Sequence, residues 1–579
     1  MTSSLRPVKS IGWRDARHVR RAALDPKLPA VQQRLWRSWL RAFTDKAPAA
    51  GLTGALLLFG LSLTPSLLPR TWQVQGVVSG VSAAVGYGLG AALHAAVRRV
   101  KPNRPSAARA RGGLLAILVA TIVAIGWVAA HVFWLVDVRR LMGIERNLAL
   151  YMIAVPVVAV FTTYVLVVAG RLVRSAFGAI ERLLSRRLPR RWAIAILGLA
   201  ALPLAVTIVD VMIAGKVFGS LDKAYLAADS SLDDTVPVPT TTLRSGGPGS
   251  LISWNTLGRQ GRHFVAGGPN AAALEAFNGA AALEPIRVYA GLGSAGTPAE
   301  RARLAVAELE RTGAFSRRAL VVITTTGTGW VDPHGIDPVE YLYNGDTAAV
   351  AIQYSYLPSW FVMLTNQDLS KEAGRALFQQ VRARWEQIPE PSRPELLLYG
   401  ESLGVFGSEA MFADPETIGE STDGVLWVGP PRASRLWSHF TSRRNPSSPV
   451  WQPVYGNGDR VRFGWDGESL SQPGGDWPRP RVVYLQQGSD PITWWSSDLL
   501  FGRPDWMRQP RSPGVSERMF FVPIATFLQT TLDLLVSTDV PEGHGHRFGT
   551  AQAEAWAAIL EPPGWTPQDT RRLVAALAS

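Results

Sequence analysis

The chain has 579 residues, more than one compact domain usually holds, and it is 47% hydrophobic with a mean hydropathy of +0.08. This composition is too apolar for a typical soluble protein and too polar for a pure transporter, so it indicates a membrane part joined to a soluble part. The sequence contains no cysteine, which excludes disulfides, thiolate metal sites and a cysteine nucleophile.

The net charge of +14 is distributed unevenly along the chain. Residues 1–191 hold 28 Lys and Arg against 6 Asp and Glu, whereas the remainder holds 31 against 39. A nucleic-acid-binding protein needs its basic patch on the folded domain, so no nucleic acid partner is expected. Attraction of basic loops to an anionic membrane surface accounts for the charge better, and the lipid bilayer is the expected partner.

The N-terminal half predicts a cytoplasmic basic segment at residues 1–47 and a five-helix transmembrane region at residues 48–215. Within the basic segment, residues 28–43 are typical either of an amphipathic helix on the membrane surface or of a plain solvated helix. A helix needs about 20 apolar residues to span a bilayer. Five stretches reach or approach this length: 51–68, 77–97, 113–136, 148–170 and 192–214.

The charges of the connecting segments predict the orientation. In chain order, the segment before the first stretch and the four connections hold 11, 1, 6, 3 and 7 Lys and Arg. This alternation places the N-terminus in the cytoplasm and everything after residue 214 on the outer side. Pro156 and Pro203 interrupt two helices, but no intramembrane charge accompanies them, so an anchor is favoured over a transporter.

The C-terminal half predicts a linker at residues 216–284, rich in Gly, Ser, Thr and Pro, that leads into an α/β domain at residues 285–579. Short apolar runs without alternation are typical of strands buried on both faces, so we expect a mostly parallel sheet with helices on both faces. The expected strands are 286–291, 319–325, 348–354, 395–399, 424–428 and 481–486, and the expected helices are 298–311, 372–387 and 551–560.

The strand expected at residues 395–399 leads directly into Gly400-Glu401-Ser402-Leu403-Gly404, a G-x-S-x-G motif. A serine in a tight turn between a strand and a helix needs small residues two positions before and after it, because the chain approaches closely there. The motif alone recurs by chance, but its place between a strand and a helical stretch makes Ser402 the candidate nucleophile.

A serine nucleophile needs a histidine base, which in this fold type follows late in the chain. Three histidines follow Ser402. His439 lies in what looks like an ordinary amphipathic helix, whereas His544 and His546 lie in a loop just before the last expected helix. We favour His546 as the base and keep His544 as the alternative.

The acid of a catalytic triad should follow a late strand and precede the histidine. Asp490 follows the strand expected at 481–486 and is the favoured candidate, with Asp423 and Asp498 as rivals. An oxyanion hole needs two backbone N–H groups.

We expect one oxyanion donor from Leu403, directly after the nucleophile. The other should come from Gly327 or Thr328, in the small-residue loop after the strand at 319–325. The competing interpretation of that loop, a phosphate-binding site, lacks the G-x-x-x-x-G-K-[ST] pattern.

Several long stretches resemble a bacterial α/β-hydrolase family that carries an N-terminal multi-helix membrane region. They are SWNTLGRQGRHFV (253–265), PIRVYAGL (285–292), TGTGWVDP (326–333), GDTAAVAIQYSYLPSW (345–360), GESLG (400–404), YLQQGSDPITWW (484–495) and VPEGHGH (540–546). The resemblance covers most of the chain. It implies the α/β-hydrolase fold and a triad of Ser402, Asp490 and a histidine of the GHGH sequence, but no settled substrate.

The expected function is that of a membrane-bound serine hydrolase acting on acyl esters or lipid-like substrates, without metal or other cofactor. Aromatic residues near the proposed site favour such substrates over peptides. They are Trp330, Tyr354, Tyr356, Trp360, Trp494 and Trp495. Acyl transfer by the same residues is equally compatible with the sequence. The intact set of Ser402, Asp490 and His546 argues against a binding module without turnover, and the uncharged helices argue against a transporter with an appended domain.

Overall fold

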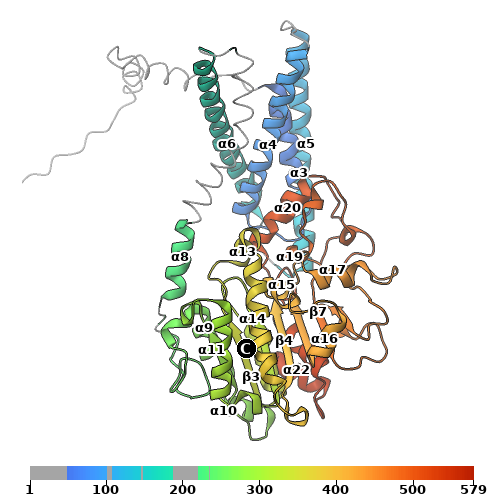
Figure 1. Ribbon diagram of the computed structural model, residues 1–579. Helices are drawn as coiled ribbons and strands as arrows, with labels where there is room; N and C mark the ends of the chain where they lie inside the picture. The colour runs from blue at the N-terminus through green and yellow to red at the C-terminus, as the bar shows by residue number, and fades with distance from the viewer. Residues whose placement is uncertain are drawn as a thin grey trace, which may run out of the picture.

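The computed structural model describes residues 48–100, 107–144, 148–186, 189, 219–231, 233 and 235–578. The expected basic segment at 1–47 and the fifth apolar stretch at 192–214 lie outside these residues. The described chain forms a bundle of apolar helices standing on one end of an α/β domain (Figure 1).

The bundle consists of α3 (Ala49–Ser62), α4 (Trp72–Val100), α5 (Ala107–Leu141) and α6 (Ala149–Leu184). Among the described residues, α4, α5 and α6 are long and apolar enough to cross a membrane. With 14 residues, α3 rises only roughly 21 Å, less than the hydrocarbon core of a bilayer. The apolar stretch expected at 51–68 therefore divides into this helix and a loop, because Pro65 cannot continue the helical hydrogen bonding.

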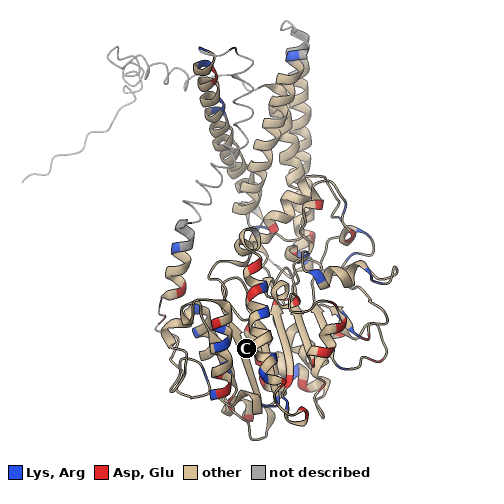
Figure 2. Ribbon diagram, in the orientation of Figure 1, with Lys and Arg blue, Asp and Glu red and all other residues tan. Residues whose placement is uncertain are grey.

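Successive helices of the bundle run in alternating directions between its two ends (Figure 1). The segment after α3 meets the α/β domain, where Arg70 pairs with Asp533, and the end of α5 meets it again, where Asp137 accepts a hydrogen bond from Ser516. The C-terminus of α4 and the N-terminus of α5 lie at the far end, and charges gather at the helix ends rather than along their middles (Figures 1 and 2).

A seven-stranded parallel sheet forms the centre of the α/β domain, with strand order β1-β3-β2-β4-β5-β7-β6. The expected fold class, an α-helical membrane-type region followed by an α/β-hydrolase-like domain, is confirmed. The strands are β1 (Ile286–Ala290), β2 (Ala319–Thr324), β3 (Thr347–Ile352), β4 (Glu395–Glu401), β5 (Gly424–Val428), β6 (Val461–Gly464) and β7 (Arg481–Leu485). The edge strand β6 was not expected, because four residues that include Arg462 give too short an apolar run.

Helices cover the faces of the sheet and its end next to the bundle (Figure 1). In Figure 1, α11 (Pro298–Arg311) and α14 (Asp368–Trp385) lie in front of the sheet. A second pair, α12 (Pro333–Leu342) and α21 (Ala551–Leu560), is joined by a hydrogen bond from the Trp556 indole to the Gly335 carbonyl. The remaining α-helices are α13 (Ser359–Thr365), α15 (Leu403–Glu409), α16 (Glu416–Ser421), α17 (Arg435–Ser442), α18 (Gly467–Leu470), α19 (Pro491–Trp494), α20 (Ala525–Asp533) and α22 (Pro567–Leu577).

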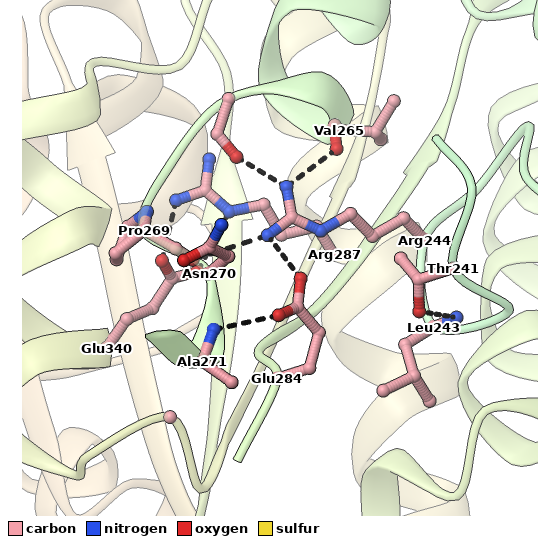
Figure 3. Close-up of polar contacts among 12 residues, drawn as sticks. Thr241, Leu243, Arg244, Val265, Pro269, Asn270, Ala271, Glu284, Arg287 and Glu340 are labelled. Atoms are coloured by element: carbon pink, nitrogen blue, oxygen red, sulfur yellow. Dashed lines mark hydrogen bonds and ion pairs between the residues drawn. The ribbon is translucent and has the colours of Figure 1, made fainter. Parts of the chain in front are cut away.

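Much of the segment expected as a linker packs onto the sheet. It forms α8 (Gly219–Ser230), α9 (Gly258–Ala266) and α10 (Ala271–Asn278). The buried Arg244 donates to the Val265 carbonyl and pairs with Glu284, whose other oxygen accepts the Ala271 N–H at 2.9 Å (Figure 3). Arg287 of β1 makes a buried ion pair with Glu340 next to this group. These contacts fix the segment against β1.

Candidate active site

Ser402 occupies a strained turn between β4 and α15. Its backbone angles are φ 56° and ψ −123°, a conformation that residues other than glycine rarely adopt. A Cβ on Gly404 would lie well within 3.0 Å of the Thr324 carbonyl, and one on Gly400 would lie 2.8 Å from the Gly404 carbonyl. The turn therefore requires the two glycines, as the motif predicts.

The neighbouring strand β5 ends beside this turn. The Ser402 N–H donates to the Val428 carbonyl at 2.8 Å, and the next residue, Gly429, has a positive φ of 59°. A Cβ on Gly429 would lie 2.8 Å from Nδ1 of His546. The imidazole of His546 thus packs against Gly429 at the carboxyl end of β5, one residue beyond the Val428 carbonyl that binds the Ser402 N–H.

Asp490 holds the imidazole of His546 through Nδ1, at 2.7 Å from Oδ2 of the carboxylate. The carboxylate is fully buried, and its other oxygen accepts the Ile492 N–H at 2.9 Å, so its orientation is fixed at the start of α19. Burial lowers the pKa of His546, but the Asp490 carboxylate outweighs this effect and the pKa is raised overall. The other ring nitrogen, Nε2, is buried without a hydrogen-bond partner in the described chain.

The structure distinguishes His546 from His544, which the sequence leaves open. Nδ1 of His544 is buried without a hydrogen-bond partner among the described residues, and burial lowers the pKa of the ring. Its Nδ1 would lie 3.5 Å from a Cβ on Gly514. The third candidate, His439, lies on α17 and contacts Arg443. Of the three, only His546 has a carboxylate partner at hydrogen-bond distance within the described structure.

The two rival acids lie elsewhere. Asp423 accepts the N–H of Leu396 at the start of β4, which is the opposite end of the strand from Ser402. Asp498 is exposed in a short 3-10 helix, Ser497–Leu500. Neither position is compatible with orienting His546.

The expected oxyanion donors differ in their availability. Leu403 is the first residue of α15, and the N–H of such a residue has no acceptor within the helix. The Gly327 N–H, in contrast, donates to Oγ of Ser359 at 3.0 Å, and the Thr328 carbonyl accepts from the Gln353 amide at 3.4 Å. Gly327 could therefore bind an oxyanion only after the Ser359 hydroxyl moves away.

A buried polar network behind the nucleophile was not expected from the sequence. The Tyr399 hydroxyl lies 3.1 Å from Glu401 and 2.9 Å from Gln552, whose amide donates to Asp332 at 2.7 Å. Burial, reinforced by the charge of Asp332, raises the pKa of Glu401 to about 8 although His546 acts in the opposite direction. The only sequence signal was a glutamate at the end of an otherwise apolar strand.

The chemistry that this geometry allows is proton transfer from a hydroxyl. Asp490 holds the ring through Nδ1, so a neutral His546 leaves Nε2 as a proton acceptor, and no hydrogen bond joins Nε2 to Ser402 within the described residues. In the described residues no group of three or more His, Asp and Glu side chains is placed to hold a metal ion.

Comparison with known proteins gives two family matches. Residues 286–573 match a family model described as an alpha/beta-hydrolase family, and residues 63–269 match one described as the N-terminus of an alpha/beta-hydrolase family. The first match contains the whole sheet and the three residues Ser402, Asp490 and His546. No curated protein and no solved structure matches the chain.

Proposed function

Because the chain belongs to the α/β-hydrolase family, we propose that it is a membrane-bound serine hydrolase that cleaves acyl esters. The observation that supports this most strongly is the buried pair of Asp490 and His546 beside the strained turn of Ser402. Gly429 leaves room for the imidazole beside this turn, and Nε2 of His546 is not occupied by another hydrogen bond among the described residues.

In the proposed reaction, the Ser402 hydroxyl attacks the ester carbonyl carbon while Nε2 of His546 accepts its proton. The tetrahedral oxyanion is stabilised by the Leu403 N–H and a second donor in the loop at 325–328. His546 then returns the proton to the departing alcohol, which leaves an acyl-enzyme on Ser402. Water then attacks the acyl carbon while Nε2 of His546 accepts a proton from it. The proton returns to the Ser402 oxygen and the carboxylic acid is released. Asp490 stabilises the imidazolium.

The position of the site favours a lipid-like substrate. The carboxyl ends of the parallel strands, where Ser402 and Asp490 lie, face the apolar bundle rather than the far side of the domain (Figure 1). Large apolar side chains are exposed in α13 and in residues 501–535, and Phe520 of the second segment packs on Trp127 and Trp134 of α5 with ring centroids 6.2 and 6.1 Å apart. The exposed set is Trp360, Phe501, Phe520, Ile524 and Leu535.

Of the six aromatic residues expected near the site, two are buried, one is exposed, and Trp330, Tyr356 and Trp495 are half-buried. Tyr354 and Trp494 are buried, and Trp494 packs on Trp437 and Trp506, so these two belong to the core. Trp360 on α13 is 44% exposed and is available to contact a lipid. The proposed substrate is therefore an acyl ester presented at a membrane surface, and the domain lies on the outer side if the basic connections face the cytoplasm.

Hydrolysis of p-nitrophenyl esters by the full chain tests this proposal, with acyl chains of 2 to 12 carbons and with detergent micelles or lipid vesicles present. We expect turnover that rises with chain length and disappears in Ser402→Ala. Ser438→Ala, a control at an exposed serine on α17, retains it. Turnover that survives in Ser402→Ala contradicts the proposal. Turnover only when an alcohol acceptor is added shows an acyltransferase instead.

A further inference from the structure

The loop that joins α3 to α4 is buried to an unusual extent for a connection between two helices of an anchor. Residues 62–68 are all buried, and so is Arg70. Leu67 and Leu68 belong to the same hydrophobic core as the central sheet of the α/β domain. The loop is therefore an integral part of the α/β domain rather than a tether, since buried apolar contacts of this kind hold two parts in one fixed arrangement.

Arg70 is the polar centre of this contact. Its side chain is 2% exposed and pairs at 2.8 Å with Asp533 of α20, which is fully buried. The guanidinium also donates to the Gln529 carbonyl at 2.7 Å, to Ser66 at 2.8 Å and to Gln75 at 3.0 Å. Several charge-assisted hydrogen bonds from one rigid planar group fix α20 relative to the bundle.

A second set of contacts links α20 to the loop at residues 537–550, which carries His544 and His546 and is called the histidine loop. Only the single turn Leu534–Val536 separates Asp533 from Ser537, whose carbonyl accepts the His546 N–H at 2.7 Å. Leu68 packs on the same loop, 3.4 Å from the position of a Cβ on Gly545. The backbone before His546 is thus held between the membrane-side loop and the end of α20.

The opposite side of the histidine loop is held by Ser489 and Asp490. Oγ of Ser489 accepts the Gly545 N–H at 2.9 Å, next to Asp490, which binds the imidazole. Two anchors therefore set the position of His546: one on the strand side, through Ser489 and Asp490, and one on the membrane side, through Ser537.

We propose that Arg70 is a positioning residue for His546, and that the bundle is thereby part of the catalytic unit and not only its anchor. This inference rests on the proposed function for the role of His546. Arg70 does not touch the reacting atoms. It holds α20, and α20 holds the backbone that carries the base, so loss of the Arg70 contacts leaves Asp533 buried without its cation and lets the loop move.

The test measures the rate at which a fluorophosphonate probe labels Ser402 in the full purified chain, over pH 5 to 9. The variants are Arg70→Met, Arg70→Lys and the double variant Arg70→Met/Asp533→Leu, which removes the unpaired carboxylate if the single variant does not fold. Arg171→Met is the matched control, because Arg171 bonds Tyr87 within the bundle and away from the α/β domain. Hydrogen exchange of the peptide at 540–548 is measured on each variant.

We expect Arg70→Met to label about tenfold to a hundredfold more slowly, since small displacements of a catalytic group have effects of that size. The acid limb of its pH profile should move to lower pH, because a displaced His546 loses the Asp490 carboxylate that raises its pKa. Exchange at 540–548 should be faster, Arg70→Lys should restore part of the rate, and Arg171→Met should match the wild type.

A folded Arg70→Met or double variant with the wild-type labelling rate, pH profile and exchange overturns the positioning role. Failure of the wild type itself to label contradicts the proposed function instead. In that case hydrogen exchange still decides whether Arg70 holds the histidine loop.

Discussion

Replacing Glu401 by glutamine should change the stability of the protein in a pH-dependent way. Glu401 is 5% exposed and its carboxyl accepts from the Tyr399 hydroxyl. Its pKa is raised from 4.5 to about 8, chiefly by burial. Glutamine matches the shape of the protonated side chain but carries no titratable proton, so the substitution isolates the effect of ionisation.

The direction in which stability changes with pH follows from proton linkage. Between pH 4.5 and about 8, Glu401 is protonated in the folded chain and ionised in the unfolded chain, so unfolding releases a proton and stability falls as the pH rises. Each pKa unit corresponds to about 1.4 kcal/mol, so the loss is under about 1 kcal/mol at pH 5 and roughly 4 kcal/mol at pH 8. Glutamine suffers no such loss.

Thermal unfolding of the full chain, followed by tryptophan fluorescence, measures this difference. The free energy of unfolding of Glu401→Gln, relative to that of the wild type, should rise by about 3–4 kcal/mol from pH 5 to pH 8. For a domain of this size this corresponds to roughly 5–8 °C in Tm. Glu420→Gln, at an exposed position on α16, serves as the control. A Tm difference between Glu401→Gln and wild type that is constant from pH 5 to pH 8 would refute the reasoning.

Three further predictions concern the base and its surroundings, each measured as the rate of fluorophosphonate labelling. Asp490→Asn should label about 10³–10⁴-fold more slowly, with its acid limb at lower pH, because the carboxylate raises the pKa of His546; an unchanged rate would contradict the assigned acid. His546→Ala should abolish labelling whereas His544→Ala should retain it, and the reverse result would exchange their roles. Gly429→Ala should slow labelling strongly, since its Cβ would meet the imidazole, whereas Gly249→Ala, also at positive φ but with no atom within 4 Å, should not.

Features that depend on local sequence could be predicted. The turn at Ser402 follows from two glycines at fixed spacing between a strand and a helix, and Asp490 follows from its place after a late strand. The two histidines of the GHGH sequence could not be distinguished, because both occupy the same loop. What separates them is the contact of His546 with Asp490, which lies 56 residues away in the chain.

Contacts between distant segments account for what the sequence did not reveal. The N–H of Gly327 is occupied by Ser359, 32 residues further on, and this pairing leaves no trace in either local pattern. Arg70 and Asp533 are 463 residues apart. Hydropathy alone also joined residues 63–68 to the first apolar stretch, since a segment buried in protein and one buried in lipid have the same composition.

The proposed reaction requires that Ser402 is an activated nucleophile. Treatment of the full purified chain with a fluorophosphonate, followed by peptide mapping by mass spectrometry, tests it most directly. We predict a single adduct on Ser402 that is absent in Ser402→Ala and in His546→Ala. Folded wild-type protein that forms no adduct, or forms it on another serine, would contradict this account.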